Sequence, residues 1–223
     1  MANIKDLLKI ESYDSIRSIL FSAGELGQKE NVEVYVVGGF VRDLLMGRPI
    51  NDIDIMIVGE GIPFAKKLAV KLGKKKVIPF KKFGTALIPN NDLQIEVATA
   101  RKEAYEDDSR KPSKVIYTDL KGDLLRRDFT INAMAMDIHP SRFGDLTDPF
   151  GGISDIENKI LSTPLDPDET FSEDPLRMMR AAYFASKLGF QIEQRCRNSI
   201  KDQAYRIEIV SMERIRDEFI KIL

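Results

Sequence analysis

The segment NDIDIMI at residues 51–57 constrains the fold of this chain more than any other. Its alternation of polar and apolar residues is typical of a β-strand with one buried face. Because side chains on a strand alternate between its two faces, the isoleucines are predicted to point into a core, while Asp52 and Asp54 point together to the opposite face. The chain must therefore build a sheet around this strand and keep two carboxylates side by side.

Two carboxylates on one strand face repel each other unless a cation lies between them. Mg²⁺, a hard ion with oxygen ligands, is the natural partner. Two such ions, about 3.5–4 Å apart, can activate an attacking hydroxyl and neutralise a leaving pyrophosphate. A third acid, Glu96, lies in the alternating run QIEVATA and could face the same way. The alternative is that these acids only keep an edge strand soluble, and it applies to Glu96 above all.

Two glycines, Gly38 and Gly39, follow the apolar run VEVYVV (32–37) and open onto a short helix predicted at 40–46. Glycines at such a junction let a phosphate approach the backbone N–H groups of a helix N-terminus. The simpler alternative is a tight turn.

The rest of the pattern predicts an α+β fold followed by helices. Helices are expected at 5–26, 40–46 and 63–73, strands at 32–39, 51–59, 76–80, 83–89 and 93–100, and a loop at 101–120. Residues 124–138 suggest a short helix that runs into a strand, and the pattern from residue 153 onward is mostly helical. We expect a small mixed sheet flanked by helices in residues 1–150, and an all-α segment in residues 151–223.

Composition narrows the class of protein. The 34 Lys and Arg against 35 Asp and Glu give a net charge of -1, which argues against a strongly basic nucleic-acid-binding module. The single cysteine, Cys196, excludes an internal disulfide framework and fits a reducing compartment such as the cytoplasm. The single histidine, His139, excludes multi-histidine metal sites. We expect no signal peptide and no membrane association, because no apolar run is long enough for either.

The segment GGFVRDLLMGRPINDIDIMI (38–57) resembles the nucleotidyltransferase signature of the DNA polymerase β superfamily. More narrowly, it is similar to the class II tRNA nucleotidyltransferases (the CCA-adding enzymes) and the bacterial poly(A) polymerases. Further blocks resemble this family in its own order, namely ARKEAYEDDSRKPSKV (100–115), LLRRDFTINAMAMD (124–137), DPFGGISDIENKIL (148–161), EDPLRMMRAAYFASKLGF (173–190) and SMERIRDEFIKIL (211–223). The resemblance covers the chain from about residue 34 to residue 223.

The resemblance implies a polymerase β-like head, a helical neck and a role for each matching residue. Asp52 and Asp54 would bind two Mg²⁺ ions, with Glu96 as the third catalytic acid. The other residues would contact the nucleotide: its triphosphate, its ribose or its base. They are Gly38, Gly39 and Arg42 for the triphosphate; Arg126, Arg127, Asp128 and Asn132 for phosphates and ribose; and Asp174, Arg177 and Arg180 for the base.

Asp174 and Arg177 are three residues apart, so on one helix they share a face. A carboxylate acceptor beside a guanidinium fork can pair with cytosine and adenine, which both present an amine donor next to a ring-nitrogen acceptor. The alternative is helix capping: Asp174 precedes Pro175, and the stretch TFSE (170–173) is spaced as a capping box.

The activity that the resemblance implies is template-independent addition of C, A or both, from CTP and ATP, to the 3′ end of tRNA or another RNA, with release of pyrophosphate. A poly(A) polymerase, or a specialised A-adding or CC-adding enzyme, is an alternative with a similar head. The segment KKFGTALIP (81–89) lacks the arginine-rich GRRF-type stretch that is usual in the family's poly(A) polymerases. A catalytically disabled nucleotide-binding fragment is the other alternative, and the intact Asp52 and Asp54 argue against it.

Two features receive no site role. Lysines at 74–76 and 81–82 could contact an RNA backbone, but a solvated helix end and turn explains them more simply. The run ERIRDEFIKIL (213–223) predicts a helix without a terminating Gly, Asn or Pro. Because members of this family continue into helical regions that grip tRNA, we expect head and neck alone, a fragment that binds nucleotide well and tRNA poorly. No pattern specifies an oligomeric state.

Overall fold

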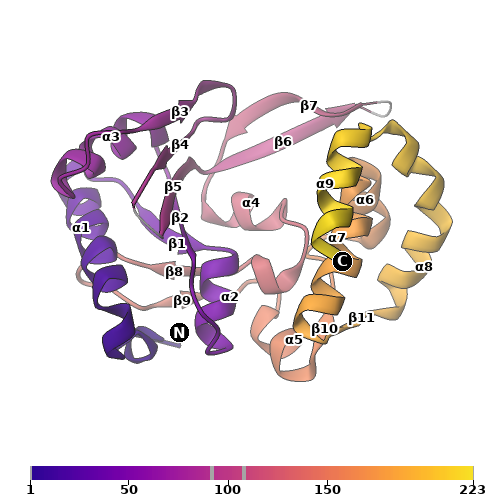
Figure 1. The fold of residues 1–223 in the computed structure, drawn as a ribbon, viewed down its shortest axis with the longest axis horizontal. Helices are drawn as coiled ribbons and strands as arrows, with labels where there is room; N and C mark the ends of the chain where they lie inside the picture. Colours follow the sequence, from indigo (N-terminus) through magenta and orange to yellow (C-terminus); the bar gives the residue numbers. More distant parts are fainter. Residues whose placement is uncertain (1, 91–92, 107–108, 223) are drawn as a thin grey trace. The chain divides into compact units, whose positions relative to one another are not determined.

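The computed structural model describes residues 2–90, 93–106 and 109–222 (Figure 1). The chain divides into two compact units, which we call unit 1 (residues 1–101, 117–123 and 134–149) and unit 2 (residues 102–116, 124–133 and 150–223). The segment 124–133 therefore packs with the helices of unit 2 rather than with the sheet of unit 1. The head–neck boundary at residue 150 stays a proposal.

A seven-stranded mixed sheet forms the centre of unit 1, with strand order β3-β4-β5-β2-β1-β8-β9. Strands β2 and β5 run parallel, and the other neighbours run antiparallel. The strands are β1 (Val34–Val37), β2 (Asp52–Ile57), β3 (Ile78–Phe80), β4 (Thr85–Ile88), β5 (Gln94–Thr99), β8 (Ala135–Asp137) and β9 (Leu146–Thr147). The predicted α+β class is confirmed.

Three helices of unit 1 pack around this sheet, and Figure 1 shows α1 and α3 together on one side of it. They are α1 (Asp14–Glu30), α2 (Gly39–Leu45) and α3 (Gly61–Lys71), and a further helix, α4 (Leu120–Leu125), runs from unit 1 into unit 2. Ile53, Ile55, Ile95 and Val97 are at most 1% exposed and form the core face of β2 and β5. Burying each such side chain contributes about 1.5–3 kcal/mol.

The prediction of one helix from residue 5 is wrong. Two short 3₁₀ helices, η1 (Lys5–Leu8) and η2 (Glu11–Tyr13), precede α1. Leu8 is fully buried, whereas Leu7 and Ile10 are exposed, so the apolar residues of this stretch do not share one helical face. Without a common buried stripe, packing does not stabilise a continuous helix there.

Residues 101–106 and 109–117 form two strands rather than the predicted loop. These are β6 (Arg101–Glu106) and β7 (Ser109–Tyr117), which pair as a two-stranded sheet. The polar composition indicated a loop, but a β-ladder satisfies the backbone N–H and C=O groups of both strands whatever the polarity of their side chains.

The rest of unit 2 is mainly helical, in agreement with the prediction. In chain order it contains η4 (Thr130–Asn132), α5 (Gly152–Asn158), α6 (Pro167–Glu173), α7 (Leu176–Leu188), α8 (Gln194–Gln203), η5 (Ala204–Ile209) and α9 (Met212–Ile222). Helix α7 packs against α9, and α6 against α8. One short parallel pair, β10 (Ile160–Leu161) with β11 (Gln191–Ile192), joins the segments before α6 and after α7.

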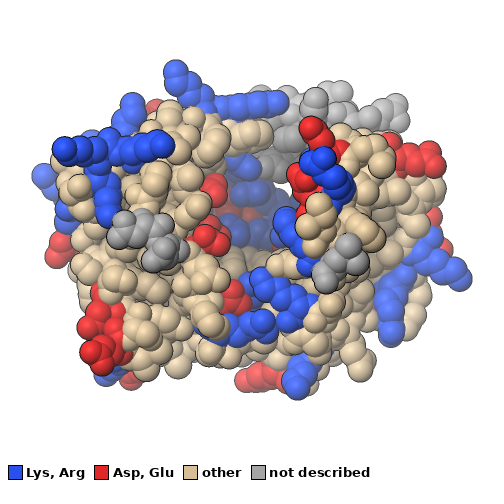
Figure 2. Space-filling model, viewed as in Figure 1, with Lys and Arg blue, Asp and Glu red and all other residues tan. Residues whose placement is uncertain are grey.

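Charge is unevenly distributed over unit 1. Figure 2 shows Lys and Arg side chains gathered over α3 and β3. Residues 61–91 contain eight lysines and no acidic residue, in a chain whose net charge is -1. Of the helices in the described ranges, none has the length and apolar character that a membrane crossing requires.

Candidate functional site

Three acids lie on one face of the unit 1 sheet. Along β2 the even positions Asp52 and Asp54 are exposed and half-buried, while Ile53 between them is fully buried. In the parallel pairing of β2 with β5, Asp54 is the register partner of Glu96, which is exposed. Register partners on neighbouring strands share a face, so Glu96 lies beside Asp54. The predicted orientation of all three carboxylates agrees with this register.

The donor set of this face fits a hard divalent cation. Asp52 and Asp54 supply carboxylate oxygens, which Mg²⁺ prefers, and Mg²⁺ completes its coordination with water and phosphate oxygens rather than with a full protein cage. The described residues include no group of three or more His, Cys, Asp or Glu side chains placed to hold a metal. Two carboxylates are therefore what the protein itself offers, and Glu96 adds negative charge next to them.

The glycine turn before α2 has a backbone conformation that requires glycine. Gly38 adopts φ 70° and ψ -133°, and its N–H donates to the Met134 carbonyl at 3.2 Å. At Gly39, an added Cβ would lie 3.3 Å from Nη2 of Arg42. The Arg42 guanidinium is thus packed directly against the turn. It is 4% exposed, and its Nε and Nη2 donate to the two carboxylate oxygens of Asp43 at 2.9 and 2.8 Å.

In unit 2, Asp128 joins η4 to α7. Its Oδ1 accepts hydrogen bonds from its neighbour's backbone N–H, at Phe129, and from Nδ2 of Asn132 at 3.0 Å. Its Oδ2 accepts a hydrogen bond from Nε of Arg180 at 2.8 Å and forms an ion pair with Nη2 of Arg180 at 2.6 Å. Asp128 is 9% exposed, so three hydrogen bonds and this ion pair compensate for the burial of its charge. This network fixes residues 126–128, which we call the RRD segment, against α7.

Asp128 and Arg180 each stabilise the charged form of the other. Burial raises the pKa of the Asp128 carboxyl, but the charge of Arg180 and the hydrogen bond from Asn132 lower it by more, so the net pKa lies below the ordinary value. The pKa of Arg180 is raised, chiefly by the charge of Asp128. The Arg180 guanidinium also lies 5.2 Å from the ring centroid of Phe184. Arg180 is therefore a structural partner of Asp128 as well as a candidate nucleotide contact.

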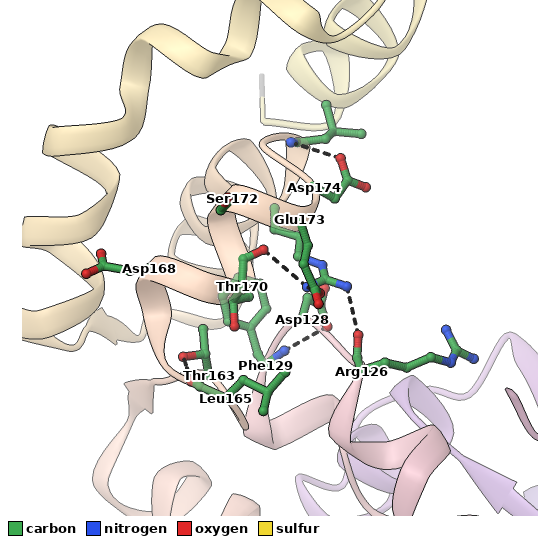
Figure 3. Close-up of polar contacts among 12 residues, drawn as sticks. Arg126, Asp128, Phe129, Thr163, Leu165, Asp168, Thr170, Ser172, Glu173 and Asp174 are labelled. Atoms are coloured by element: carbon green, nitrogen blue, oxygen red, sulfur yellow. Dashed lines mark hydrogen bonds and ion pairs between the residues drawn. The ribbon is translucent and has the colours of Figure 1, made fainter. Parts of the chain in front are cut away.

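Arg177 is also held by neighbours, and Figure 3 labels three of them: Thr170, Glu173 and Arg126. Its Nη1 donates to the Thr170 carbonyl at 3.1 Å and to Oε2 of Glu173 at 3.0 Å, and its Nη2 donates to the Arg126 carbonyl at 2.8 Å. These bonds use three of the five N–H donors of a guanidinium. The fork is 7% exposed and held in one orientation. In the same view the side chain of Arg126 points away from this network.

Asp174 bonds the start of α7, but the N-cap residue of that helix is Pro175, not Asp174 as the capping alternative predicted. Its Oδ1 accepts from the backbone N–H of Leu176 at 3.2 Å, and its Oδ2 accepts from Nη2 of Arg214 on α9 at 3.4 Å. The capping box predicted at 170–173 is wrong. Thr170 lies inside α6, and its buried Oγ1 has no hydrogen-bond partner among the described residues. The cap of α6 is Asp166, which accepts from the N–H of Asp168.

Sequence reasoning missed several residues that hold these side chains. Glu173 supports Arg177 at the i, i+4 spacing, a signal that could have been read from the sequence. Arg214 contacts Asp174 from 40 residues away, and Asp155 accepts from the hydroxyls of Thr130 and Ser162. Such contacts depend on how the helices pack, and no local pattern indicates them.

Family models match most of the chain. Residues 34–162 match "Poly A polymerase head domain", and residues 189–223 match "Probable RNA and SrmB- binding site of polymerase A". Both acid-bearing strands, β2 and β5, and residues 126–128 lie within the first match.

Individual proteins and solved structures similar to this chain point to the same family as the family models. The chain is 40% identical over 191 residues to a CCA-adding enzyme of Lactobacillus helveticus (strain DPC 4571), covering 85% of this chain and 46% of that protein. It is 42% identical over 170 residues to an A-adding tRNA nucleotidyltransferase of Aquifex aeolicus (strain VF5), covering 76% of this chain and 20% of that protein. A structure described as "Thermotoga maritima CCA-adding enzyme complexed with tRNA_CCA" superposes with a TM-score of 0.85 at 34% identity, covering all of this chain and 50% of that one.

This chain thus spans at most about half the length of these relatives. The family match does not depend on that difference, because the head model alone covers more than half of the chain and the α+β sheet carries its acids in the expected register. The chain belongs to the family of proteins that contain the poly A polymerase head domain.

Proposed function

We propose that this protein is a template-independent RNA nucleotidyltransferase that adds C, A or both to the 3′ end of tRNA. An RNA 3′-hydroxyl would attack the α-phosphate of CTP or ATP, forming a new phosphodiester bond as pyrophosphate leaves. The observation that carries this proposal is the placement of Asp52, Asp54 and Glu96 on one face of the sheet. Phosphoryl transfer needs little more from a protein than positioning and charge neutralisation, and this face supplies negative charge for a cation.

Asp52 and Asp54 would hold Mg²⁺, and Glu96 would add charge beside them. Two bound Mg²⁺ ions supply Lewis-acid activation of the attacking hydroxyl and neutralisation of the leaving pyrophosphate. No covalent enzyme intermediate is needed, which suits a chain whose one cysteine, Cys196, is buried with its pKa raised to about 11 by burial. The reducing cytoplasm is the proposed setting for the same thiol.

The triphosphate would lie against Gly38, Gly39 and Arg42 in unit 1. Arg42 presents a guanidinium that Asp43 holds in a fixed fork, a geometry that matches phosphate oxygens. In unit 2, the phosphates and ribose would contact the RRD segment and its neighbour. Those residues are Arg126, Arg127, Asp128 and Asn132.

Base selection would come from Asp174 and Arg177, with Arg180 assisting. Arg177 keeps two N–H donors beyond its three structural bonds, and those bonds fix their direction. Asp174 would supply the carboxylate acceptor, in an orientation set by its bonds to Leu176 and Arg214. A fixed donor beside a fixed acceptor would pair with the edge of cytosine or adenine. Guanine and uracil present the reverse pattern, so donor would face donor and acceptor would face acceptor.

The relatives leave the set of added nucleotides open, since both CCA-adding and A-adding enzymes are among them. The decisive experiment is gel extension of a tRNA that lacks its 3′ CCA, with each nucleoside triphosphate supplied separately and together. Incorporation of C and then A supports CCA addition. Incorporation of A alone onto a tRNA ending in CC supports the A-adding alternative, and long A tracts support a poly(A) polymerase.

The same assay contains the outcome that contradicts any transferase. Absence of C and of A incorporation, combined with Mg²⁺-dependent nucleotide binding, would leave only a disabled nucleotide-binding fragment. The control is Glu60→Gln, because Glu60 is an exposed acid that follows β2 and contributes nothing to the acid face.

A further inference from the structure

The strongest charge feature of unit 1 has no part in the site above. Residues 61–91 carry a charge of +8 with no acid, so the remainder of a chain with net charge -1 carries -9. We use the term lysine surface for the six lysines of this segment that lack an acidic partner in the described part of the chain: Lys66, Lys74, Lys75, Lys76, Lys81 and Lys82. The other two, Lys67 and Lys71, pair with Glu30 and Glu25 of α1.

Two exposed aromatic rings lie among these lysines. Phe80 ends β3 and Phe83 ends the 3₁₀ helix η3 (Lys81–Phe83), and each is 44% exposed. The Nζ of Lys82 and the guanidinium carbon of Arg101 both lie 5.8 Å from the ring centroid of Phe83. Alternating cations and exposed rings are what proteins use to hold a nucleic-acid backbone and to stack on its bases.

Protection of a sheet edge does not account for this combination. Strand β3 is the edge strand of the seven-stranded sheet, and lysines on an edge do prevent pairing with other chains. Two exposed phenylalanines on the same edge would work against that protection, because they add apolar surface. Lysines and aromatics together are instead typical of a surface that binds a ligand.

The sheet register connects the lysine surface to the acid face. Asp54, Glu96, Leu87 and Ile78 are successive register partners on β2, β5, β4 and β3. Register partners share a face, and three steps of about 4.8 Å place Ile78 about 14 Å from Asp54. Phe80, two residues after Ile78, is on that same face. An RNA whose 3′ end reaches the acids could therefore continue across β4 to the edge in a few nucleotides.

We propose that the lysine surface of unit 1 binds the phosphate backbone of the substrate RNA next to its reacting end. The occupant is RNA because its phosphates complement six unpaired lysines and its bases suit exposed rings. The choice of RNA rests on the proposed function, which brings an RNA end to the acids of the same sheet face. This surface also corrects the expectation drawn from the net charge: the basic character is present but concentrated in one segment.

The test is tRNA binding as a function of salt. A variant with Lys75→Gln, Lys76→Gln, Lys81→Gln and Lys82→Gln is compared with a control carrying Lys5→Gln, Lys29→Gln, Lys121→Gln and Lys201→Gln, four exposed lysines elsewhere. Each phosphate contact contributes about 0.7–0.9 to the slope of log affinity against log salt. We expect the first variant to lose about 3 from this slope and at least about tenfold in affinity at 0.1 M salt, and the control to match the parent chain.

A third variant carries arginine substitutions at the same four positions: Lys75→Arg, Lys76→Arg, Lys81→Arg and Lys82→Arg. It keeps the positive charge, so it separates an effect of lost charge from an effect of impaired folding. It should bind tRNA as the parent does, and all variants are checked by thermal unfolding. Equal slopes for the first variant and the control would overturn the proposal. So would loss of binding to anionic phosphatidylserine vesicles with tRNA binding unchanged, since that result would assign the surface to a membrane.

Failure here is distinguishable from failure of the proposed function. Binding is measured without transfer, so an inactive chain still reports its salt slope. Conversely, a chain that extends a short RNA primer but shows no lysine-dependent tRNA binding would keep the proposed activity and lose only this inference.

Discussion

Asp52 and Asp54 can be replaced without touching the core, so their proposed part in metal binding can be tested separately from folding. Each lies on the solvent face of β2, while the adjacent Ile53 and Ile55 form the core. If these acids hold the cation as proposed, replacing either by alanine should lower nucleotide incorporation by at least about a hundredfold, because a metal ligand is lost. Stability should change by no more than about 0.5 kcal/mol at the exposed Asp52, and the relief of charge repulsion acts against any loss.

The measurement is primer extension alongside thermal unfolding, with Glu60→Gln as the matched control. Full incorporation by either alanine variant would remove the metal assignment. A large fall in unfolding temperature would instead show that the acids are structural.

Arg177 tests base reading against helix packing. Arg177→Lys keeps the charge but loses the planar fork, so only a point charge remains near the base. We expect the preference for CTP and ATP over GTP and UTP to fall by about tenfold or more, with the KM for the accepted nucleotides little changed. If discrimination among the four triphosphates is unaltered while stability falls, Arg177 acts only by joining Thr170, Glu173 and the Arg126 carbonyl.

Asp128 makes a pH prediction. Its folded-state pKa lies below the ordinary value of about 3.9, so the pair with Arg180 stabilises the fold fully above that pH. The stabilisation is lost as pH falls through the lowered folded-state pKa. Asp128→Asn should cost about 2 kcal/mol at pH 7, less than a fully buried pair because the Arg180 side chain is 34% exposed.

Urea unfolding between pH 7 and pH 3 checks this prediction. The stability difference between the parent chain and Asp128→Asn should shrink on the acid side of pH 4. A constant difference over that range would mean that the charge of Asp128 does not contribute. Asp202→Asn, at an exposed acid of α8, serves as the control.

At the scale of single elements, helix α6 contains a defect that can be repaired. The Oγ1 of Thr170 is buried inside this helix, and the part of the chain that the structure describes gives it no hydrogen-bond partner. Thr170→Val keeps the shape and the β-branching and removes the unsatisfied hydroxyl, which should stabilise the chain by about 1 kcal/mol. That gain corresponds to a rise of about 2–4 °C in the unfolding temperature. A fall in that temperature would show that the hydroxyl has a partner, such as an ordered water.

Elements with a strong local period could be predicted from sequence, and elements fixed by packing could not. The alternation in 51–57 predicted β2, its buried face and the shared direction of its acids, all of which the structure contains. The helix predicted before α1 was wrong because the apolar residues of that stretch lack a common face. The loop predicted from residue 101 was wrong because β6 and β7 are strands of polar composition. The partners of Asp128, Arg177 and Asp174 come from other helices, so only the fold brings them together.

At the scale of the whole molecule, ligand binding should appear as stability. A ligand that binds only the folded chain at 100 times its Kd stabilises it by about 2.7 kcal/mol, which raises the unfolding temperature by about 5–10 °C for a chain of 223 residues. Mg²⁺ with CTP or ATP should produce this rise, and Mg²⁺ with GTP or UTP should produce much less, if Asp174 and Arg177 select the base as proposed.

Removal of Mg²⁺ and substitution of Asp54 separate the contribution of the metal to this rise in unfolding temperature from that of the nucleotide. Removing Mg²⁺ with a chelator should leave the unfolding temperature of the nucleotide-free chain unchanged, since the core face of β2 does not depend on a metal. It should reduce the effect of CTP, and Asp54→Ala should reduce it equally even with Mg²⁺ present. Equal shifts for all four nucleotides would separate triphosphate binding from base reading, because the contacts proposed for Gly38 and Arg42 involve phosphates that every nucleotide shares.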